Sequence, residues 1–331
     1  MFLQKKNAPK GKSLDNRNLY KMNAIRIGTR GSKLALWQAH YIADKLKEAG
    51  LTSEVVIIET KGDLILDRTL AKVGSKGIFT EEIEEQLRLK QIDIAVHSAK
   101  DLQSELHPDF CIIAFTEREK ANDVLVSHHS NLDLNKPVVI GTSSVRRTAL
   151  FKYYYPELVI KSVRGNLQTR MQKMEAGEAD ALALAYAGVH RMQYDSFIRH
   201  TFTVNQLVPP VGQGTVAVEA SRHMPESMIH TIRKAVNHAP TELALTAERA
   251  FLKRLQGGCS IPAFAFAQTA GRQLQIGGGI ISTDARQLIK KSFSGEAEEA
   301  EKLGYALAES VLSEGGAEIL KHIRAEQAKS N

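Results

Sequence analysis

The sequence has no long apolar run and only two cysteines, and these absences narrow what the protein can be. No stretch approaches the roughly 18 uninterrupted apolar residues of a membrane-spanning helix, so we expect no membrane association. Cys111 and Cys259 lie far apart and form no disulfide framework, which favours a reducing compartment, the cytosol. The start of the chain lacks the pattern of a secretory signal or a transit peptide. We also expect no metal site.

Acidic residues are scarce at the start of the chain, and most of the net charge of +7 comes from that segment. Residues 1 to 23 hold six lysines and arginines against Asp15 alone, so we expect a basic, disordered extension. The rest of the chain is almost balanced in charge. A nucleic-acid partner is therefore not expected, although a basic chain keeps that alternative open.

At 331 residues the chain is too long for one hydrophobic core, and its first two thirds repeat one pattern. Strands alternate with helices, which favours mostly parallel sheets with ligands at the carboxyl ends of the strands. Three turn motifs recur in the same order: Ile27-Gly28-Thr29 as Ile140-Gly141-Thr142, Lys61-Gly62-Asp63 as Arg164-Gly165-Asn166, and Asp93–Val96 as Asp180–Ala183. We therefore expect two similar α/β lobes around a cleft.

The pattern changes near residue 239, where a smaller α+β domain is expected. The first lobe should comprise residues 24–116 and 215–236, the second 122–208, and the last domain 239–331. Crossings near 116–122 and 208–214 would act as hinges. In the last domain we expect a helix capped by Thr241 and running to Leu255, strands at 263–268 and 274–282, and helices from Glu296 onward.

Cations gather where the strands of the second lobe end. The turn Gly141-Thr142-Ser143-Ser144 leads into a helix that begins Val145-Arg146-Arg147, so backbone N–H groups, hydroxyls and guanidinium groups converge there. Lys152, Lys161, Arg164 and Arg170 follow, and Arg30 occupies the matching turn of the first lobe. The pattern predicts a carboxylate or phosphate site; a capped helix with exposed arginines is the alternative.

Two further segments bear ionisable side chains. The glycine-rich stretch 66–77 contains Lys72 and Lys76 and would serve as a cationic lid, without the order of a nucleotide phosphate loop. Asp101, beside Lys100 and after a buried strand, would be a carboxylate held ionised at the cleft, or else a helix cap. His97 is better explained as a core histidine than as a base.

The two cysteines lie in different surroundings. Cys111 belongs to an apolar strand and is simply a small buried side chain. Cys259 follows Gly257-Gly258 in a turn past a helix, where a thiol can be exposed. From the residues alone, a reactive role and an inert one both remain open.

In this order the motifs resemble the hydroxymethylbilane synthase, or porphobilinogen deaminase, family from about Ala24 to the C-terminal helices. The matching segments are Gly28–Ser32 with Leu34–Ala39, Ala71–Gly74 with Lys76-Gly77, His97–Asp101, Gly141–Arg147, Arg164–Asn166 with Thr169-Arg170, Val211–Gly214 and Leu255–Cys259. Ala99, Gln103, Lys120 and Asn122 depart from the family pattern.

The resemblance implies two lobes of the type II periplasmic-binding-protein kind and a transferase of tetrapyrrole biosynthesis. Four porphobilinogen molecules would be added, each with loss of ammonia, to a dipyrromethane cofactor bound as a thioether to Cys259. Asp101, with Lys100, would be catalytic by stabilising the cation formed as ammonia departs. The family is monomeric, and its product, hydroxymethylbilane, passes to the next tetrapyrrole enzyme.

The resemblance also implies which residues bind the acetate and propionate groups of the pyrroles. Those that would hold the cofactor are Arg30, Ser32, Lys100, Ser144, Arg146, Arg147, Arg164, Gly165 and Arg170. Those that would act on the substrate during elongation are Lys72, Lys76, Arg191 and Gln213.

Two other classes of function remain as alternatives. A two-lobed anion receptor or sensor domain would share the fold. The absence of a signal peptide and of a helix-turn-helix argues against it, and it leaves Cys259 unexplained. A cysteine hydrolase is the other alternative, although the sequence around Cys259 matches no hydrolase pattern and no histidine partner is assigned.

Overall fold

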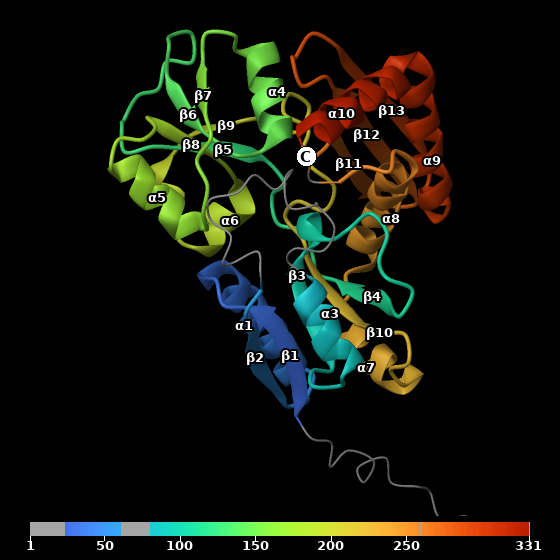
Figure 1. Ribbon diagram of the computed structural model, residues 1–331. Helices are drawn as coiled ribbons and strands as arrows, with labels where there is room; N and C mark the ends of the chain where they lie inside the picture. Colours follow the sequence, from blue (N-terminus) through green and yellow to red (C-terminus); the bar gives the residue numbers. More distant parts are fainter. Residues whose placement is uncertain (1–23, 61–79, 259, 331) are drawn as a thin grey trace, which may run out of the picture.

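The computed structural model describes residues 24–60, 80–258 and 260–330, and it has three parts (Figure 1). Two α/β lobes lie one above the other, and a third part with its own sheet packs beside the upper lobe. Within the described ranges no helix has both the length and the apolar character needed to cross a membrane.

The first lobe is built on a five-stranded sheet in the order β2-β1-β3-β10-β4. Its strands are β1 (Ile25–Arg30), β2 (Ser53–Ile58), β3 (Ile94–Ser98), β4 (Phe110–Phe115) and β10 (Val216–Ser221), and its helices are α1 (Lys33–Glu48), α3 (Glu81–Arg88) and α7 (Glu226–Val236). β1 runs parallel to β2 and β3, whereas β10 is antiparallel to β3 and β4. The chain thus returns to this sheet after forming the second lobe.

The second lobe repeats the first, as the recurring turns predicted. Its strands are β5 (Asp123–Val126), β6 (Val139–Gly141), β7 (Val159–Lys161), β8 (Ala181–Ala185) and β9 (Ile198–Thr201), and its helices are α4 (Val145–Tyr154), α5 (Leu167–Glu175) and α6 (Tyr186–Arg191). The order β7-β6-β8-β5-β9 places its strands as in the first sheet, with an antiparallel strand in fourth place.

The third part packs a three-stranded antiparallel sheet against helices. It comprises α8 (Ala239–Arg254), β11 (Ala263–Ala270), β12 (Gln273–Ile281), β13 (Leu288–Glu296), α9 (Ala300–Val311) and α10 (Ala317–Ser330). One prediction was wrong here: the cap of α8 is His238, whose ring accepts the Thr241 N–H. The terminal helices follow Glu296 as predicted, directly after β13, a strand for which the sequence showed no pattern.

The third part contacts both lobes through buried side chains. Leu245 of α8 packs with Phe115 and Ala217 of the first lobe. Phe264 of β11 joins the core of the second lobe, which includes Phe151. Burial of large side chains from three parts in shared clusters makes these contacts a substantial part of the folding free energy.

The two crossings between the lobes run side by side and are bonded to each other. The Glu119 N–H donates to the Gly214 carbonyl at 3.1 Å. Gly214 has φ +91, and a Cβ there would overlap the Glu119 carbonyl oxygen, so only glycine allows this approach. Glu248 of α8 secures both crossings, because it binds Arg118 at 2.7 Å and accepts the Gly212 N–H at 2.9 Å.

Candidate active site

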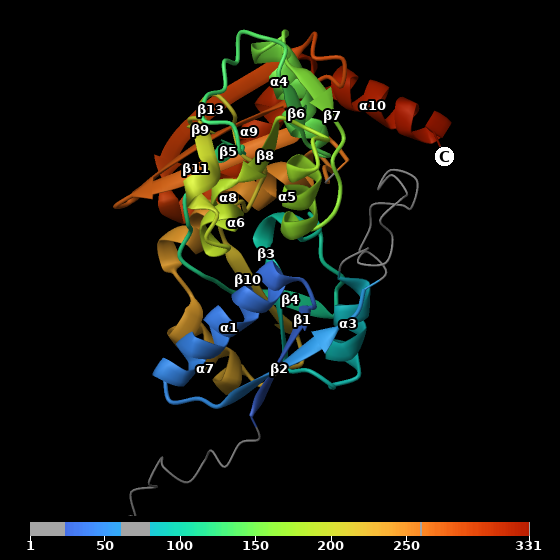
Figure 2. The ribbon, with the colours of Figure 1, turned by 90° about the vertical axis from the view of Figure 1, so that its left-hand side faces the viewer.

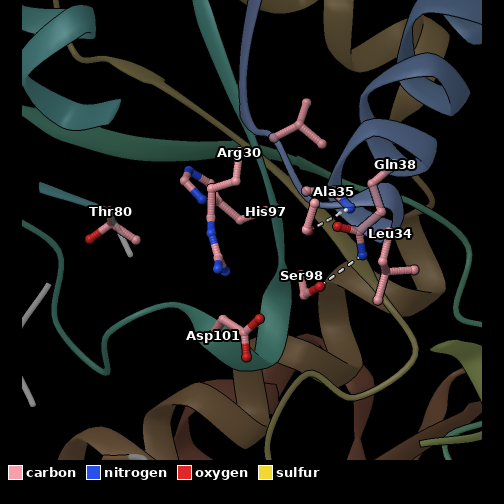
Figure 3. Close-up of a pocket in the computed structure, with 10 residues that line it drawn as sticks. Arg30, Leu34, Ala35, Gln38, Thr80, His97, Ser98 and Asp101 are labelled. Atoms are coloured by element: carbon pink, nitrogen blue, oxygen red, sulfur yellow. Dashed lines mark hydrogen bonds between the residues drawn. The ribbon is translucent and has the colours of Figure 1, made fainter. Parts of the chain in front are cut away.

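A pocket of about 80 Å³ opens at the carboxyl ends of β1 and β3 (Figure 3). Arg30 ends β1 and extends toward Asp101. Ser32 caps α1, its Oγ accepting the Ala35 N–H at 3.3 Å. Gln38, which sequence reasoning missed, donates from Nε2 to Ser98 Oγ at 2.8 Å. The described residues that line the pocket are Arg30, Ser32, Leu34, Ala35, Gln38, Thr80, Val96, His97, Ser98 and Asp101.

Asp101 and Lys100 lie in a short 3-10 turn, Ala99–Asp101, directly after β3. A backbone hydrogen bond holds this turn in place, because the Ala99 N–H donates to the Thr215 carbonyl at 3.0 Å. Asp101 is exposed and lies within the turn, so it is not the helix cap that was the alternative prediction. Burial lowers the pKa of Lys100 to about 8 despite the opposing effect of Asp101, and Arg147 adds to the lowering.

His97 is a buried histidine with a partner, as its sequence context predicted. Its Nε2 lies 2.9 Å from Glu219 Oε2, and both side chains are almost fully buried. The antiparallel register pairs His97 with Ala217, so Glu219 is a diagonal neighbour on the same face of the sheet. Glu84 packs nearby, and burial, with Glu219, raises its pKa. This pair anchors the strand that ends at the Asp101 turn.

Across the cleft, the turn Arg164-Gly165-Asn166 leads into α5. Asn166 caps the helix by accepting the Thr169 N–H at 2.9 Å, and Arg170 Nε donates to the Gly165 carbonyl at 2.8 Å. Burial lowers the pKa of Arg170 to about 10, and the charge of Arg147 adds to this, while Asp101 of the other lobe opposes it. Charges from the two lobes therefore lie close enough to affect each other.

Arg146 and Arg147 already hold a carboxylate, that of Asp123. Arg146 Nη2 lies 2.6 Å from Asp123 Oδ2, and Arg147 Nη2 lies 2.7 Å from Asp123 Oδ1; all three side chains are buried. Although burial opposes ionisation, the two guanidinium groups keep the pKa of Asp123 well below its ordinary value. The two arginines converge as predicted. Part of their positive charge is balanced by the Asp123 carboxylate inside the protein. No local sequence pattern indicated a role for Asp123.

Ser144 and Gln213 support this cluster. Ser144 caps α4, its Oγ accepting the Arg147 N–H at 3.4 Å. Gln213 Nε2 donates to Asp123 Oδ1 at 2.9 Å and to the Ala121 carbonyl at 2.7 Å. The buried Arg146 Nε has no hydrogen-bond partner among the described residues. Two arginines against one aspartate leave a net positive charge beside the cleft.

Arg191, at the end of α6, contacts both the crossings and the first lobe. Its Nη2 donates to the Gly214 carbonyl at 2.7 Å, and its guanidinium carbon lies 5.1 Å from the centre of the Trp37 ring. Burial lowers its pKa, against the effect of Glu119. The Arg191 side chain therefore reaches from α6 of the second lobe to α1 of the first lobe.

Three predicted site residues lie outside the described ranges: Cys259, Lys72 and Lys76. The residues beside the cysteine are described. The Ile261 N–H donates to the Gly258 carbonyl at 3.0 Å, and Gln327 Nε2 of α10 donates to the Ser260 carbonyl at 3.1 Å. The other cysteine, Cys111, is half-buried in β4, and burial raises the pKa of its thiol.

Comparison with protein families gives two matches. Residues 25–228 match the model described as "Porphobilinogen deaminase, dipyromethane cofactor binding domain", and residues 242–313 match "Porphobilinogen deaminase, C-terminal domain". Curated relatives named porphobilinogen deaminase include that of Desulfosudis oleivorans, 50% identical over 92% of this chain and 99% of its own. That of Cytophaga hutchinsonii is 51% identical over the same shares.

Solved structures with similar folds are much more distant in sequence. They include the BvgS VFT2 domain of Bordetella pertussis, 13% identical, with a TM-score of 0.40 over 64% of this chain and 86% of that one. A substrate-binding domain of a putative amino acid ABC transporter from Streptococcus pneumoniae is also 13% identical, with a TM-score of 0.42 over 64% of this chain and 91% of that one.

Proposed function

The chain belongs to the porphobilinogen deaminase family, and from this membership we propose how its residues carry out the reaction. The enzyme is a transferase that joins four porphobilinogen molecules in succession and releases ammonia and the linear tetrapyrrole hydroxymethylbilane. The observation that carries the proposal is the gathering of Lys100 and Asp101 of one lobe with Arg147 and Arg170 of the other.

The described residues fit a bound group rich in carboxylates. Lys100 and Arg170 have lowered pKa values because they are buried beside other cations. Carboxylates of a ligand bound nearby would raise these pKa values again, because they stabilise the charged forms of both side chains. Arg146 Nε is buried with no partner in the described chain, and its cluster with Asp123 has an excess of positive charge. Each pyrrole bears an acetate and a propionate, so a dipyrromethane supplies four carboxylates.

We assign the cofactor to residues of both lobes and of the third part. When bound, the dipyrromethane supplies the free pyrrole position to which the first substrate is joined. Cys259 would hold it through a thioether, as the motif Leu255–Cys259 implies. Its carboxylates would be bound by the cleft residues Arg30, Ser32, Lys100, Ser144, Arg146, Arg147, Arg164, Gly165 and Arg170, the arginines in bidentate fashion.

Asp101 is the proposed catalytic carboxylate. It is exposed at the pocket, on a turn fixed by β3 and β10, so it can approach a substrate without being buried itself. As ammonia leaves porphobilinogen, positive charge develops on the substrate, and an ionised carboxylate at this place lowers the energy of that state. Asp101 would also take up the proton displaced when the new bond forms.

The remaining predicted residues concern elongation. Arg191 and Gln213 lie on and beside the crossings and would contact the growing chain, together with Lys72 and Lys76. We further propose that the enzyme works in the cytosol as a monomer and that its product passes to the next tetrapyrrole enzyme, on the basis of the family resemblance.

Intact-mass spectrometry tests the proposal on protein from a porphobilinogen-producing host. The wild-type chain should bear an added mass of two pyrrole units, which Cys259→Ser should lose. Cys111→Ser is the matched control, because it removes the only other cysteine and should keep the added mass. A bare polypeptide mass for the wild type would refute the attachment.

Asp101→Asn tests the catalytic role separately. The variant should keep the added mass, since attachment does not depend on repeated turnover, and should lose most activity; removal of an electrostatic stabiliser typically costs about 10²–10³ in kcat. Near-normal turnover would remove Asp101 from the mechanism. The exposed Asp133→Asn, on the second lobe away from the pocket, serves as the control.

A further inference from the structure

The contact between Trp37 and Arg191 crosses from one lobe to the other. Trp37 lies on α1 of the first lobe, and Arg191 ends α6 of the second. The two helices meet in both views of the molecule (Figures 1 and 2). One turn earlier on each helix, Gly188 lies opposite Leu34, and a Cβ added to it would be 3.7 Å from Leu34 Cδ2, so the two pairs form one small interface between the lobes.

Trp37 is itself held in place by a stack of side chains. Its ring lies 5.3 Å from that of Tyr41, with only 12° between the planes, and Lys45 lies 5.1 Å from the Tyr41 ring on the same helix. Residues four apart share one face of a helix, so this stack follows from their spacing. The indole therefore presents a fixed face to the Arg191 guanidinium, which lies 5.1 Å away.

Arg191 is fixed at its other side by the crossings. The Gly214 carbonyl accepts both Arg191 Nη2 at 2.7 Å and the Glu119 N–H at 3.1 Å. The guanidinium thus lies between the point where the two crossings meet and a side chain of the first lobe. The indole contacts the face of the guanidinium, so this contact fixes the plane of the group without using its N–H donors.

We propose that Trp37 is a positioning residue: its indole holds the Arg191 guanidinium in the orientation that binds a carboxylate of the substrate. The inference rests on the proposed function, because it assigns Arg191 to a substrate carboxylate. The Gly214 carbonyl accepts one N–H of the guanidinium, and the indole fixes its plane, so the direction of the group is set before a substrate binds.

The chain provides its own reporter, since Trp37 is its only tryptophan. Its fluorescence emission in the purified holoenzyme should change in Arg191→Gln, and Arg191→Lys should give an intermediate change because a cation remains. Arg222→Gln is the control: it removes an exposed arginine on the first lobe and should leave the emission unchanged. Equal emission in the wild type and Arg191→Gln would overturn the contact.

Intact mass keeps this inference distinguishable from the proposed function. Porphobilinogen is added to the wild type and to the Trp37 variants, and the number of bound units is read by intact mass. The absence of any added unit in the wild type would overturn the proposed function, whereas normal addition in the wild type with unchanged kinetics in Trp37→Leu would overturn the positioning role alone.

Variants of Trp37 test the positioning role. Trp37→Leu should lower kcat/KM about 5- to 30-fold, mainly through KM, which corresponds to loss of a cation–π contact of about 1–2 kcal/mol. Trp37→Phe keeps an aromatic face and should recover much of that loss. Equal kinetics in the wild type and Trp37→Leu, or equal losses in both variants, would overturn the role.

Discussion

The burial of Lys100 beside the arginines should make the protein less stable than it would be with a neutral side chain. The pKa of Lys100 is about 8 in the folded protein, against 10.5 ordinarily, and this gap corresponds to about 3 kcal/mol. Because part of the side chain reaches solvent, screening reduces the expected figure to about 1–3 kcal/mol. Lys100→Met should therefore stabilise the fold at pH 7 while lowering activity.

The pH dependence distinguishes this explanation from a general gain in packing. Below pH 8 both states hold the proton, and the folded state bears the whole cost. Between pH 8 and 10.5 the unfolded chain binds more protons, so wild-type stability rises with pH and the advantage of Lys100→Met shrinks. By pH 9.5 it should fall to less than about half its value at pH 7.

Urea denaturation at pH 7 and 9.5 measures the effect. The experiment is best done in a Cys259→Ser background, where no cofactor carboxylate compensates Lys100. Lys152→Met, at an exposed position, is the control and should change the free energy of unfolding by no more than about 0.5 kcal/mol. The reasoning is refuted if Lys100→Met is no more stable than the control at pH 7, or if its advantage does not shrink with pH.

Two further changes test the parts that support the cleft. Asp123→Asn leaves Arg146 and Arg147 buried without their carboxylate and should cost about 3–5 kcal/mol in urea denaturation; a loss under 1 kcal/mol would contradict the buried pairing. Gly214→Ala should cost more than Gly50→Ala, because both have positive φ but only Gly214 meets another backbone; equal losses would show that the close approach is unimportant.

The sequence predicted the fold correctly where a local motif marks the end of a strand. Gly28-Thr29 and Gly141-Thr142 predicted two equivalent strands, and the matched orders of the two sheets confirm this. β1 nevertheless continues to Arg30, so the first of these turns lies within the strand. β13 was missed because its side chains are mostly half-exposed or exposed, and it is held by backbone pairing to β12.

The site residues found from the sequence are those on local motifs, such as Asp101 after its strand and Arg170 on its helix. Those missed depend on contacts between distant segments. Asp123 lies 23 and 24 positions from its arginines, and Glu248 lies 130 positions from Arg118. No periodicity or spacing links such pairs, because the fold alone brings them together. The sequence therefore identified an excess of cations but not the acid that neutralises part of it.

The return crossing links these elements through three consecutive residues. Gly212 donates to Glu248 of the third part, Gln213 donates to Asp123 of the second lobe, and the Gly214 carbonyl accepts Arg191. A Cβ on Gly212 would lie 2.8 Å from the carbonyl carbon of Ala99, the first residue of the Asp101 turn. The segment that bonds to the second lobe and to the third part is therefore packed directly against the turn that bears the proposed catalytic carboxylate, so this one segment ties the position of Asp101 to all three parts of the molecule.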